Sequence, residues 1–271
     1  MMKILNGIEA IDLALFFDSN VVISDVHIGY EEALNKQGIL VPRLQFEEIT
    51  ARMNNIFGIL KDRRIETIVI NGDLKHEFGT ISEQEWRNTL KFLDLLAKHC
   101  KEIVLIKGNH DNILGPIARK RNVKVMDYFV FELKDKNSNN ENPLLGNPLK
   151  KLKKIMKNRD SPKKILIAHG DSIPQKDVLK DVSVIIIGHE HPAVSINDGP
   201  RVEKFKCFLK GKYKGKNLIV QPSFNTMIEG TDILKDKLLS PFLKQDLDNF
   251  EVYAVEDKIY NFGRLKGLRK N

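Results

Sequence analysis

Five short runs of consecutive apolar, mostly β-branched residues occur in the part of the chain before residue 190. They span residues 21–23, 67–70, 103–106, 165–167 and 184–187. Their hydrophobicity is continuous rather than alternating, which is typical of strands that are buried on both faces of a sheet. We therefore predict five internal strands.

Helical patterns separate the first three of these strands. From Pro42 to about residue 61, apolar side chains recur at the spacing of one helix face. Ser82 and Glu85 form a capping box, which marks a helix start, and apolar residues follow at helical spacing. This alternation of strand and helix predicts a layered α/β sheet.

The pattern after Asp111 changes twice. A short helix over about 113–120 and two strands over 123–126 and 128–133 come first, and a helix that opens at 147–148 follows. Strand patterns dominate after Val194. We expect a basic hairpin over 201–216 with its turn near Gly211 and Gly215, a strand over 218–221, and a terminal hairpin formed by 251–255 and 258–261.

Positive charge is concentrated in two segments. Residues 134–164 contribute +7 and residues 201–216 contribute +6, which leaves the rest of the chain at −5 against a net charge of +8. We interpret 134–164 as a basic surface insertion. Clustered lysines favour a partner with a phosphate backbone such as DNA. A lysine-rich solvated surface explains the same charge equally well.

Composition also narrows the class of protein. The 271 residues suffice for one large domain, and no stretch approaches the roughly 20 apolar residues of a bilayer-spanning helix. Glu9 and Asp12 interrupt the apolar N-terminus, which argues against a signal peptide. The only two cysteines, Cys100 and Cys207, lie far apart, as expected in a reducing compartment. We predict a cytoplasmic protein without a membrane partner.

Side chains that bind metals follow each of the five apolar runs. The carboxyl ends of strands in an open α/β sheet face the ligand crevice, so these side chains should converge. Six of the seven histidines belong to this set. Its members are Asp25, His27, Asp73, His76, Asn109, His110, Asp111, His169, Asp171, His189 and His191.

These ligand types restrict the metal. Mixed imidazole and carboxylate ligands suit Mn, Fe, Zn, Ni or Co, and the absence of thiolates argues against a structural zinc site. Two aspartates, an asparagine and four histidines are too many for one ion and fit two ions that share a carboxylate. Two such ions are the usual machinery for hydrolysing phosphate esters.

The ordered motifs D-x-H, G-D-x-x-H, G-N-H-D, H-G-D and G-H-x-H resemble those of the calcineurin-like metallophosphoesterase superfamily. Residues 73–78 and 188–192 are most similar to the archaeal subgroup related to SbcD-type repair nucleases. The ligase-associated bacterial endonucleases of the superfamily are a second neighbour. The resemblance implies a four-layer α/β/β/α sandwich of two mixed sheets flanked by helices, formed as a single domain over residues 1–271.

The resemblance also implies roles for individual residues. His110 would stabilise the transition state and protonate the leaving alkoxide, and Asp111 would orient its imidazole. His76 would be a second active-site histidine or a supporting residue, and both readings stay open. The site would hold two divalent ions, preferably manganese, with Fe, Ni, Co or Zn as alternatives. One ion would be bound by Asp25, His27, Asp73 and His191. The other would be bound by Asp73, Asn109, His169 and His189.

Three functions compete. The first is a metal-dependent phosphodiesterase that cuts DNA and binds it through the basic segments 134–164 and 201–216. These segments would replace the capping domain of SbcD-type nucleases, for which the roughly 80 residues after His191 leave no room. The second is a phosphoesterase for a nucleotide, cyclic dinucleotide or other small phosphoester. The third is a scaffold without activity, like the retromer subunit of this superfamily, which the presence of His110 disfavours. A homodimer is compatible with the sequence, although nothing in it demands one.

Overall fold

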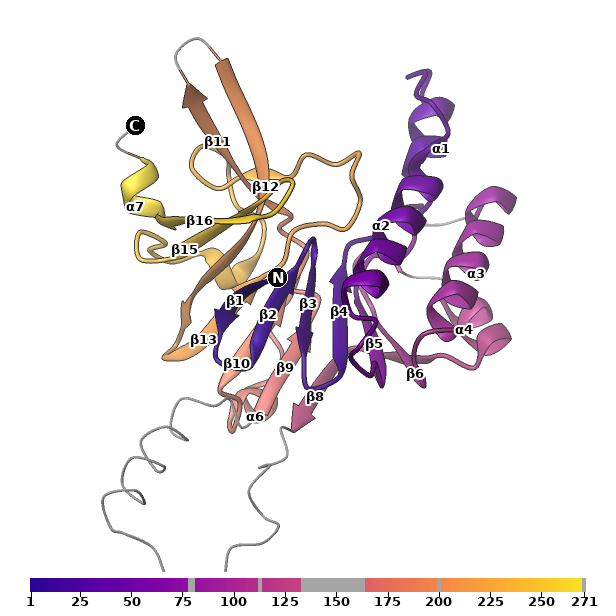
Figure 1. Ribbon diagram of the computed structural model, residues 1–271, viewed down its shortest axis with the longest axis horizontal. Helices are drawn as coiled ribbons and strands as arrows, with labels where there is room; N and C mark the ends of the chain where they lie inside the picture. Colours follow the sequence, from indigo (N-terminus) through magenta and orange to yellow (C-terminus); the bar gives the residue numbers. More distant parts are fainter. Residues whose placement is uncertain (78–80, 112–113, 133–163, 199–200, 270–271) are drawn as a thin grey trace, which may run out of the picture.

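Two β-sheets lie face to face, with the long helices on the outer face of the first sheet (Figure 1). The computed structural model describes the chain except residues 78–80, 112–113, 133–163, 199–200 and 270–271. None of the helices within the described ranges is long and apolar enough to cross a membrane.

The first sheet runs in the order β1-β2-β3-β4-β5-β6-β7. Its N-terminal strands are antiparallel, whereas β4 to β7 are parallel to one another. Ser24 pairs with Asn71, which pairs with Ile106, so the loops after β4, β5 and β6 leave the sheet side by side. The strands are β1 (Met2–Leu5), β2 (Ile8–Ile11), β3 (Ala14–Phe17), β4 (Asn20–Ser24), β5 (Thr67–Asn71), β6 (Glu102–Ile106) and β7 (Lys124–Met126).

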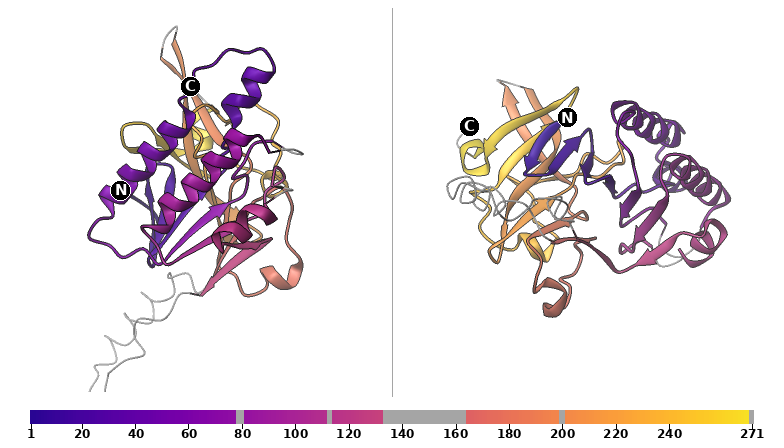
Figure 2. Two further views of the ribbon diagram at one scale, coloured as in Figure 1. Left: turned by 90° about the vertical axis from the view of Figure 1, so that its right-hand side faces the viewer. Right: turned by 60° about the horizontal axis from the view of Figure 1, so that its bottom comes forward.

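Four helices lie on the outer side of this sheet, and the first of them lies beyond the end of the strands rather than over the face (Figure 1 and Figure 2). They are α1 (Tyr30–Lys36), α2 (Gln45–Ile59), α3 (Glu83–Ala97) and α4 (Gly115–Arg121). The hydroxyl of Ser82 accepts a hydrogen bond from the Glu85 N–H at 3.1 Å, so the helix start predicted at Ser82 is confirmed. The second half of the predicted capping box is absent, because the Glu85 carboxylate accepts from the N–H groups of His76 and Glu77 instead.

The second sheet runs in the order β14-β11-β12-β13-β10-β9-β8, and β15 pairs with both β12 and β16. Ile187 pairs with Ala168 and Val220, so the parallel strands β9, β10 and β13 also end at one level. The strands are β8 (Tyr128–Glu132), β9 (Lys164–Ala168), β10 (Val184–Ile187), β11 (Pro192–Asp198), β12 (Arg201–Tyr213), β13 (Lys216–Val220), β14 (Thr231–Asp232), β15 (Glu251–Val255) and β16 (Ile259–Arg264).

The central strands of the second sheet are buried on both faces. Ile165 and Ile167 of β9 join the core between the sheets, whereas Leu166 joins an outer core that contains Phe242 and Leu265. The predicted architecture of two mixed sheets flanked by helices is confirmed. Within the described residues, the outer layer of the second sheet consists of irregular chain with the short helices α6 (Lys176–Leu179), η1 (Pro241–Leu243) and α7 (Leu265–Leu268).

All five predicted internal strands are confirmed as β4, β5, β6, β9 and β10. The predicted turn near Gly215 is confirmed, because the chain turns at 214–215. The hairpin bounds 201–216 and the turn near Gly211 are wrong, because β12 is one strand from Arg201 to Tyr213 that pairs with β13, and Gly211 lies within it opposite Leu218. Gly211 serves packing instead, since a Cβ there would lie 2.5 Å from the Phe250 ring. Residues 134–163 of the basic insertion and the helix predicted to open at 147–148 lie outside the described residues.

The strands β1 to β3 were not predicted. The Asn6–Gly7 pair between β1 and β2 is a hairpin signal that could have identified them. Gly7 adopts the left-handed backbone conformation, at φ 80°, that this turn requires.

Candidate metal centre and active site

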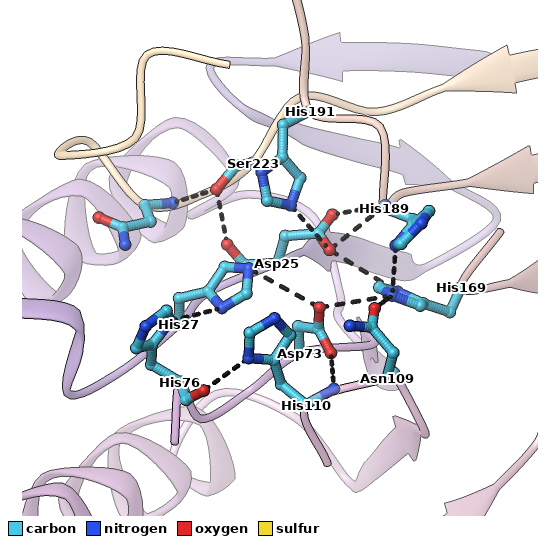
Figure 3. Close-up of polar contacts among 12 residues, drawn as sticks. Asp25, His27, Asp73, His76, Asn109, His110, His169, His189, His191 and Ser223 are labelled. Carbon is cyan, nitrogen blue, oxygen red and sulfur yellow. Dashed lines mark hydrogen bonds and ion pairs between the residues drawn. The ribbon is translucent and has the colours of Figure 1, made fainter. Parts of the chain in front are cut away.

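The loops that follow β4, β5, β6, β9 and β10 meet at one end of the two sheets (Figure 3). They bring together all seven residues expected to bind metal. His27 Nε2 and His169 Nε2 lie 3.7 Å and 3.4 Å from Asp73 Oδ2. His191 Nε2 lies 3.2 Å from Asp25 Oδ1. The two aspartates thus sit between imidazoles contributed by both sheets.

The remaining ligands join this cluster through His169. Its Nε2 lies 3.1 Å from Asn109 Oδ1 and 3.2 Å from His189 Nδ1. The ligand atoms of Asp25, His27 and His191 form one group within 4.8 Å, and those of Asp73, His169 and His189 form another. Two adjacent groups of donors therefore exist.

Five of these residues adopt the left-handed backbone conformation. Non-glycine residues rarely do so, and each costs on the order of 1 kcal/mol, which proteins tolerate mainly at functional sites. The strained turns aim side chains of consecutive loops at one point. The φ angles are 54° for Asp25, 48° for His27, 46° for Asp73, 64° for His189 and 49° for His191.

Two glycines permit the close packing of the loops. A Cβ on Gly72 would collide with the imidazole of His169, and a Cβ on Gly108 would collide with the carboxylate of Asp73. Both positions must therefore lack a side chain for the two sheets to bring their ligands together.

The electrostatics of the centre are those of a cation site. Burial alone would raise the pKa of Asp25, but His191, His169 and the Ser24 hydroxyl outweigh it and lower the pKa to about 2. Burial likewise opposes a charge on His169, but its contacts with Asp73 and Asp25 raise the pKa of this imidazole to about 9. Burial also opposes a charge on Asp73, but its contact with His169 lowers the pKa of Asp73, so both aspartates are anionic at neutral pH.

The donor set fits divalent metal ions. The Nε2 atoms of His27 and His191 are buried and have no hydrogen-bond partner among the described residues. An imidazole nitrogen that is buried beside a carboxylate yet makes no hydrogen bond is suited to donate its lone pair to a cation. Carboxylate, amide and imidazole donors are also the ligands expected for Mn, Fe, Co, Ni or Zn.

His76 and His110 lie beside His27. The ring centroids of His110 and His76 lie 4.8 Å and 5.4 Å from that of His27. His76 Nδ1 lies 3.4 Å from His27 Nδ1, behind the ligand ring. The backbone N–H of His110 donates to Asp73 Oδ1 at 2.8 Å, so the residue is fixed directly to the aspartate between the two groups.

The Asp111 carboxylate connects two loops of the site. It accepts hydrogen bonds from the backbone N–H groups of Leu74, Lys75 and Gly108. Burial, followed by the charge of Asp73, raises the pKa of Asp111 to about 7. His110 Nδ1 contacts the backbone carbonyl of His76 at 2.5 Å.

Several supporting residues were not identified from the sequence. Ser223 donates its hydroxyl to the Asp25 carbonyl at 2.7 Å. Gln45 donates to the His27 carbonyl at 2.8 Å. Glu190 accepts from the N–H groups of Leu239 and Ser240. Of these three residues, only Glu190 lies inside a ligand motif. It is therefore the only one of the three that the sequence could have suggested.

Comparison with known proteins assigns the fold and site to a class. The calcineurin-like phosphoesterase family matches residues 21–193, and the chain belongs to this family. It is a metal-dependent phosphoesterase.

The structure is similar to several solved structures. Nuclease MPE of Pseudomonas putida has a TM-score of 0.55 and 17% identity, over 93% of this chain and 92% of that one. The phosphoesterase YfcE of E. coli has a TM-score of 0.40 and 13% identity, over 91% and 97%. Zinc-bound Vps29 of Entamoeba histolytica has a TM-score of 0.38 and 16% identity, over 89% and 96%. No curated protein matches the sequence. At such identities the first similarity supports the fold alone.

Proposed function

We propose that the chain is a two-metal phosphodiesterase that cuts DNA. The observation that carries this proposal is the pair of donor groups around Asp73 with His110 fixed beside them. We assign one ion, preferably Mn, to Asp25, His27, Asp73 and His191, and the other to Asp73, Asn109, His169 and His189. When bound, such ions activate water and neutralise the phosphoryl oxygens.

The protein's own groups would perform the remaining steps. Asp73 contacts donors of both sets and is the residue suited to bridge the ions. His110 would protonate the leaving alkoxide, and Asp111 would hold the loops that carry both residues. His76 supports the ligand ring of His27 in this scheme.

A projecting hairpin supports DNA as the substrate. The strands β11 and β12 extend beyond the body of the second sheet (Figure 1), and β11 begins directly after the ligand His191. Lys204 and Lys206 lie two residues apart in β12 and therefore on the same face. Lys206 donates to the Ser223 carbonyl beside the site at 3.1 Å. Lysine side chains thus lead from the hairpin toward the centre, and burial lowers the pKa of Lys206 to about 7.

Two further features are compatible with this assignment. Residues 73–78 and 188–192 resemble the archaeal SbcD-related subgroup, and a structural neighbour of P. putida is a nuclease by its name. We also propose that the basic segment 134–164 contributes to DNA binding.

A substrate panel with added Mn tests the proposal. We expect cleavage of plasmid or oligonucleotide DNA and of bis-p-nitrophenyl phosphate, with little hydrolysis of p-nitrophenyl phosphate. Preference for the monoester would overturn the diesterase assignment. Preference for a cyclic dinucleotide over DNA would overturn the nuclease assignment and favour the small-molecule alternative.

The hairpin offers a matched pair of charge reversals. Lys204→Glu should raise KM for DNA and reduce the dependence of binding on salt, by about one unit of the log–log slope per lost phosphate contact. Lys212→Glu lies in the same strand near its other end and should change neither. Hydrolysis of bis-p-nitrophenyl phosphate should be unaffected by both. Equal effects of the two variants on DNA would contradict a specific role for the hairpin.

A further inference from the structure

A fully buried lysine lies beside the centre and belongs to neither donor group. Lys75 is 0% exposed, although lysine is almost never fully buried. Its ammonium group donates to the backbone carbonyl of His110 at 2.6 Å and also to the carbonyl of Glu77. We propose that Lys75 is a positioning residue, which together with Glu85 sets the orientation of the His110 imidazole.

The loop that contains Lys75 is held from two directions. Glu85 of α3 is also 0% exposed, and its Oε1 accepts from the N–H groups of His76 and Glu77 at 2.9 Å and 3.1 Å. Lys75 binds carbonyl oxygens, whereas Glu85 binds N–H groups. The backbone of residues 75–77 is therefore fixed on both its donor and its acceptor side.

This loop holds the ring of His110. The His76 carbonyl lies 2.5 Å from His110 Nδ1, and a carbonyl oxygen can only accept a hydrogen bond. The contact therefore places a proton on Nδ1 and assigns the transferable proton to Nε2. Lys75 fixes the same residue at its carbonyl, so His110 is held at both its ring and its backbone.

A simple packing role does not explain a lysine at this position. Burying an ammonium group is costly unless it is paired and hydrogen-bonded, whereas an apolar side chain would fill the same space. An apolar residue would, however, leave the carbonyls of Glu77 and His110 without their buried donor. The charge adds a link between two loops that also meet through Asp111, the His76 carbonyl and the Asp73 carboxylate.

The test uses the leaving group and rests on the proposed acid role of His110. Diphenyl phosphate loses a weakly acidic phenol, which needs the proton more than the acidic p-nitrophenol of bis-p-nitrophenyl phosphate does. Lys75→Met should lower kcat for diphenyl phosphate and DNA about 10–100-fold, within the range of general-acid effects. It should lower kcat for bis-p-nitrophenyl phosphate less than about threefold and leave bound metal unchanged.

Controls separate positioning from folding. Lys91→Met, at an exposed site on α3, should change nothing. In a His110→Ala background, Lys75→Met should cause no further loss of kcat. If Lys75→Met does not fold, as judged by thermal unfolding, then Glu85→Ala, which removes the acceptor of the His76 and Glu77 N–H groups, should show a similar leaving-group dependence.

Two outcomes would overturn the proposal. One is an equal loss on all substrates, and the other is a loss of bound metal that accounts for the lost activity. The wild-type protein is assayed first, so the absence of any diesterase activity would refute the proposed function rather than the role of Lys75. Activity on the aryl diesters without activity on DNA would refute the nuclease assignment and leave this test intact.

Discussion

The two sheets contribute different chemistry to the centre. The first-sheet side, made of the loops after β4, β5 and β6, supplies both aspartates, the asparagine and the stacked rings of His76 and His110. The second-sheet side, made of the loops after β9 and β10, supplies only imidazole donors, namely His169, His189 and His191. Anionic charge and the proposed proton donor therefore belong to one sheet, and imidazole ligands complete the site from the other.

The two sides are also anchored differently. On the first-sheet side, Lys75, Glu85 and Asp111 bind backbone groups of the loops themselves. On the second-sheet side, Glu190 lies between two ligand histidines and binds the distant residues 239–240. The difference predicts that removing the anchors Lys75, Glu85 or Asp111 alters the chemistry, whereas removing the anchor Glu190 alters metal affinity and stability.

Asp73→Asn should have the largest effect because this carboxylate contacts imidazoles of both sides. Loss of its charge should weaken binding of both ions and lower kcat/KM about 10⁴-fold, which corresponds to several kcal/mol of transition-state stabilisation. Isothermal titration with Mn and hydrolysis of bis-p-nitrophenyl phosphate would measure both effects. Retention of full metal binding would contradict the bridging role.

One histidine variant on each side tests the difference between the two sides directly. His110→Ala should lower kcat about 10³-fold on DNA, the size of a general-acid contribution, while metal binding persists. His189→Ala should weaken metal binding, and excess Mn should partly restore its activity. The comparison requires metal titration and DNA cleavage on both variants. The proposed difference between the two sides would be contradicted if excess Mn restored the activity of His110→Ala. It would also be contradicted if excess Mn failed to restore any activity of His189→Ala.

The sequence was sufficient to predict the convergence of the ligands. Continuous apolar runs identified strands buried on both faces, and parallel strands end at a common edge, so Asp25, Asp73 and His169 could be expected to meet. This reasoning needs only local pattern and one rule of topology. It does not reach the supporting contacts, which depend on how distant loops pack.

Lys75 and Gly211 show why those contacts could not be predicted. A lysine in a polar segment is ordinarily exposed, and its burial here follows from carbonyls in two separate loops. Gly211 resembled a turn residue, but the Phe250 ring from a distant segment takes the space of its missing side chain. In both cases the determining partner is remote in sequence.

The anchor of the second-sheet side gives a smaller prediction. Glu190→Ala should lower the free energy of unfolding by about 2 kcal/mol because it leaves the N–H groups of Leu239 and Ser240 without their acceptor. We expect metal affinity to fall about tenfold as the histidine loop loosens. Urea unfolding and Mn titration would measure these changes. Glu190→Gln keeps an acceptor oxygen and should therefore retain most of the stability and most of the metal affinity. If it does not, the negative charge of Glu190 rather than its hydrogen bonds is responsible.

The smallest effect is expected at Glu251, which touches neither side of the centre. Its carboxylate accepts from the Tyr253 hydroxyl at 2.6 Å and pairs with Lys210 at 3.1 Å. Burial opposes its ionisation, but Tyr253 and Lys210 outweigh burial and lower the pKa of Glu251. The folded state therefore binds this proton less readily than the unfolded chain, so the stabilisation exists above the ordinary pKa of glutamate and is lost as pH falls below it.

Glu251→Gln should accordingly cost about 0.5 kcal/mol of unfolding free energy at pH 7, as for a partly exposed ion pair. The difference from the wild-type protein should shrink toward zero as the pH falls through the acid range, because both side chains are then neutral. Urea unfolding at several pH values would measure it, with metal binding and hydrolysis unchanged at pH 7. A change in kcat would contradict the separation, because it would mean that the chemistry responds to charges far from the loops that carry Asp73 and His110.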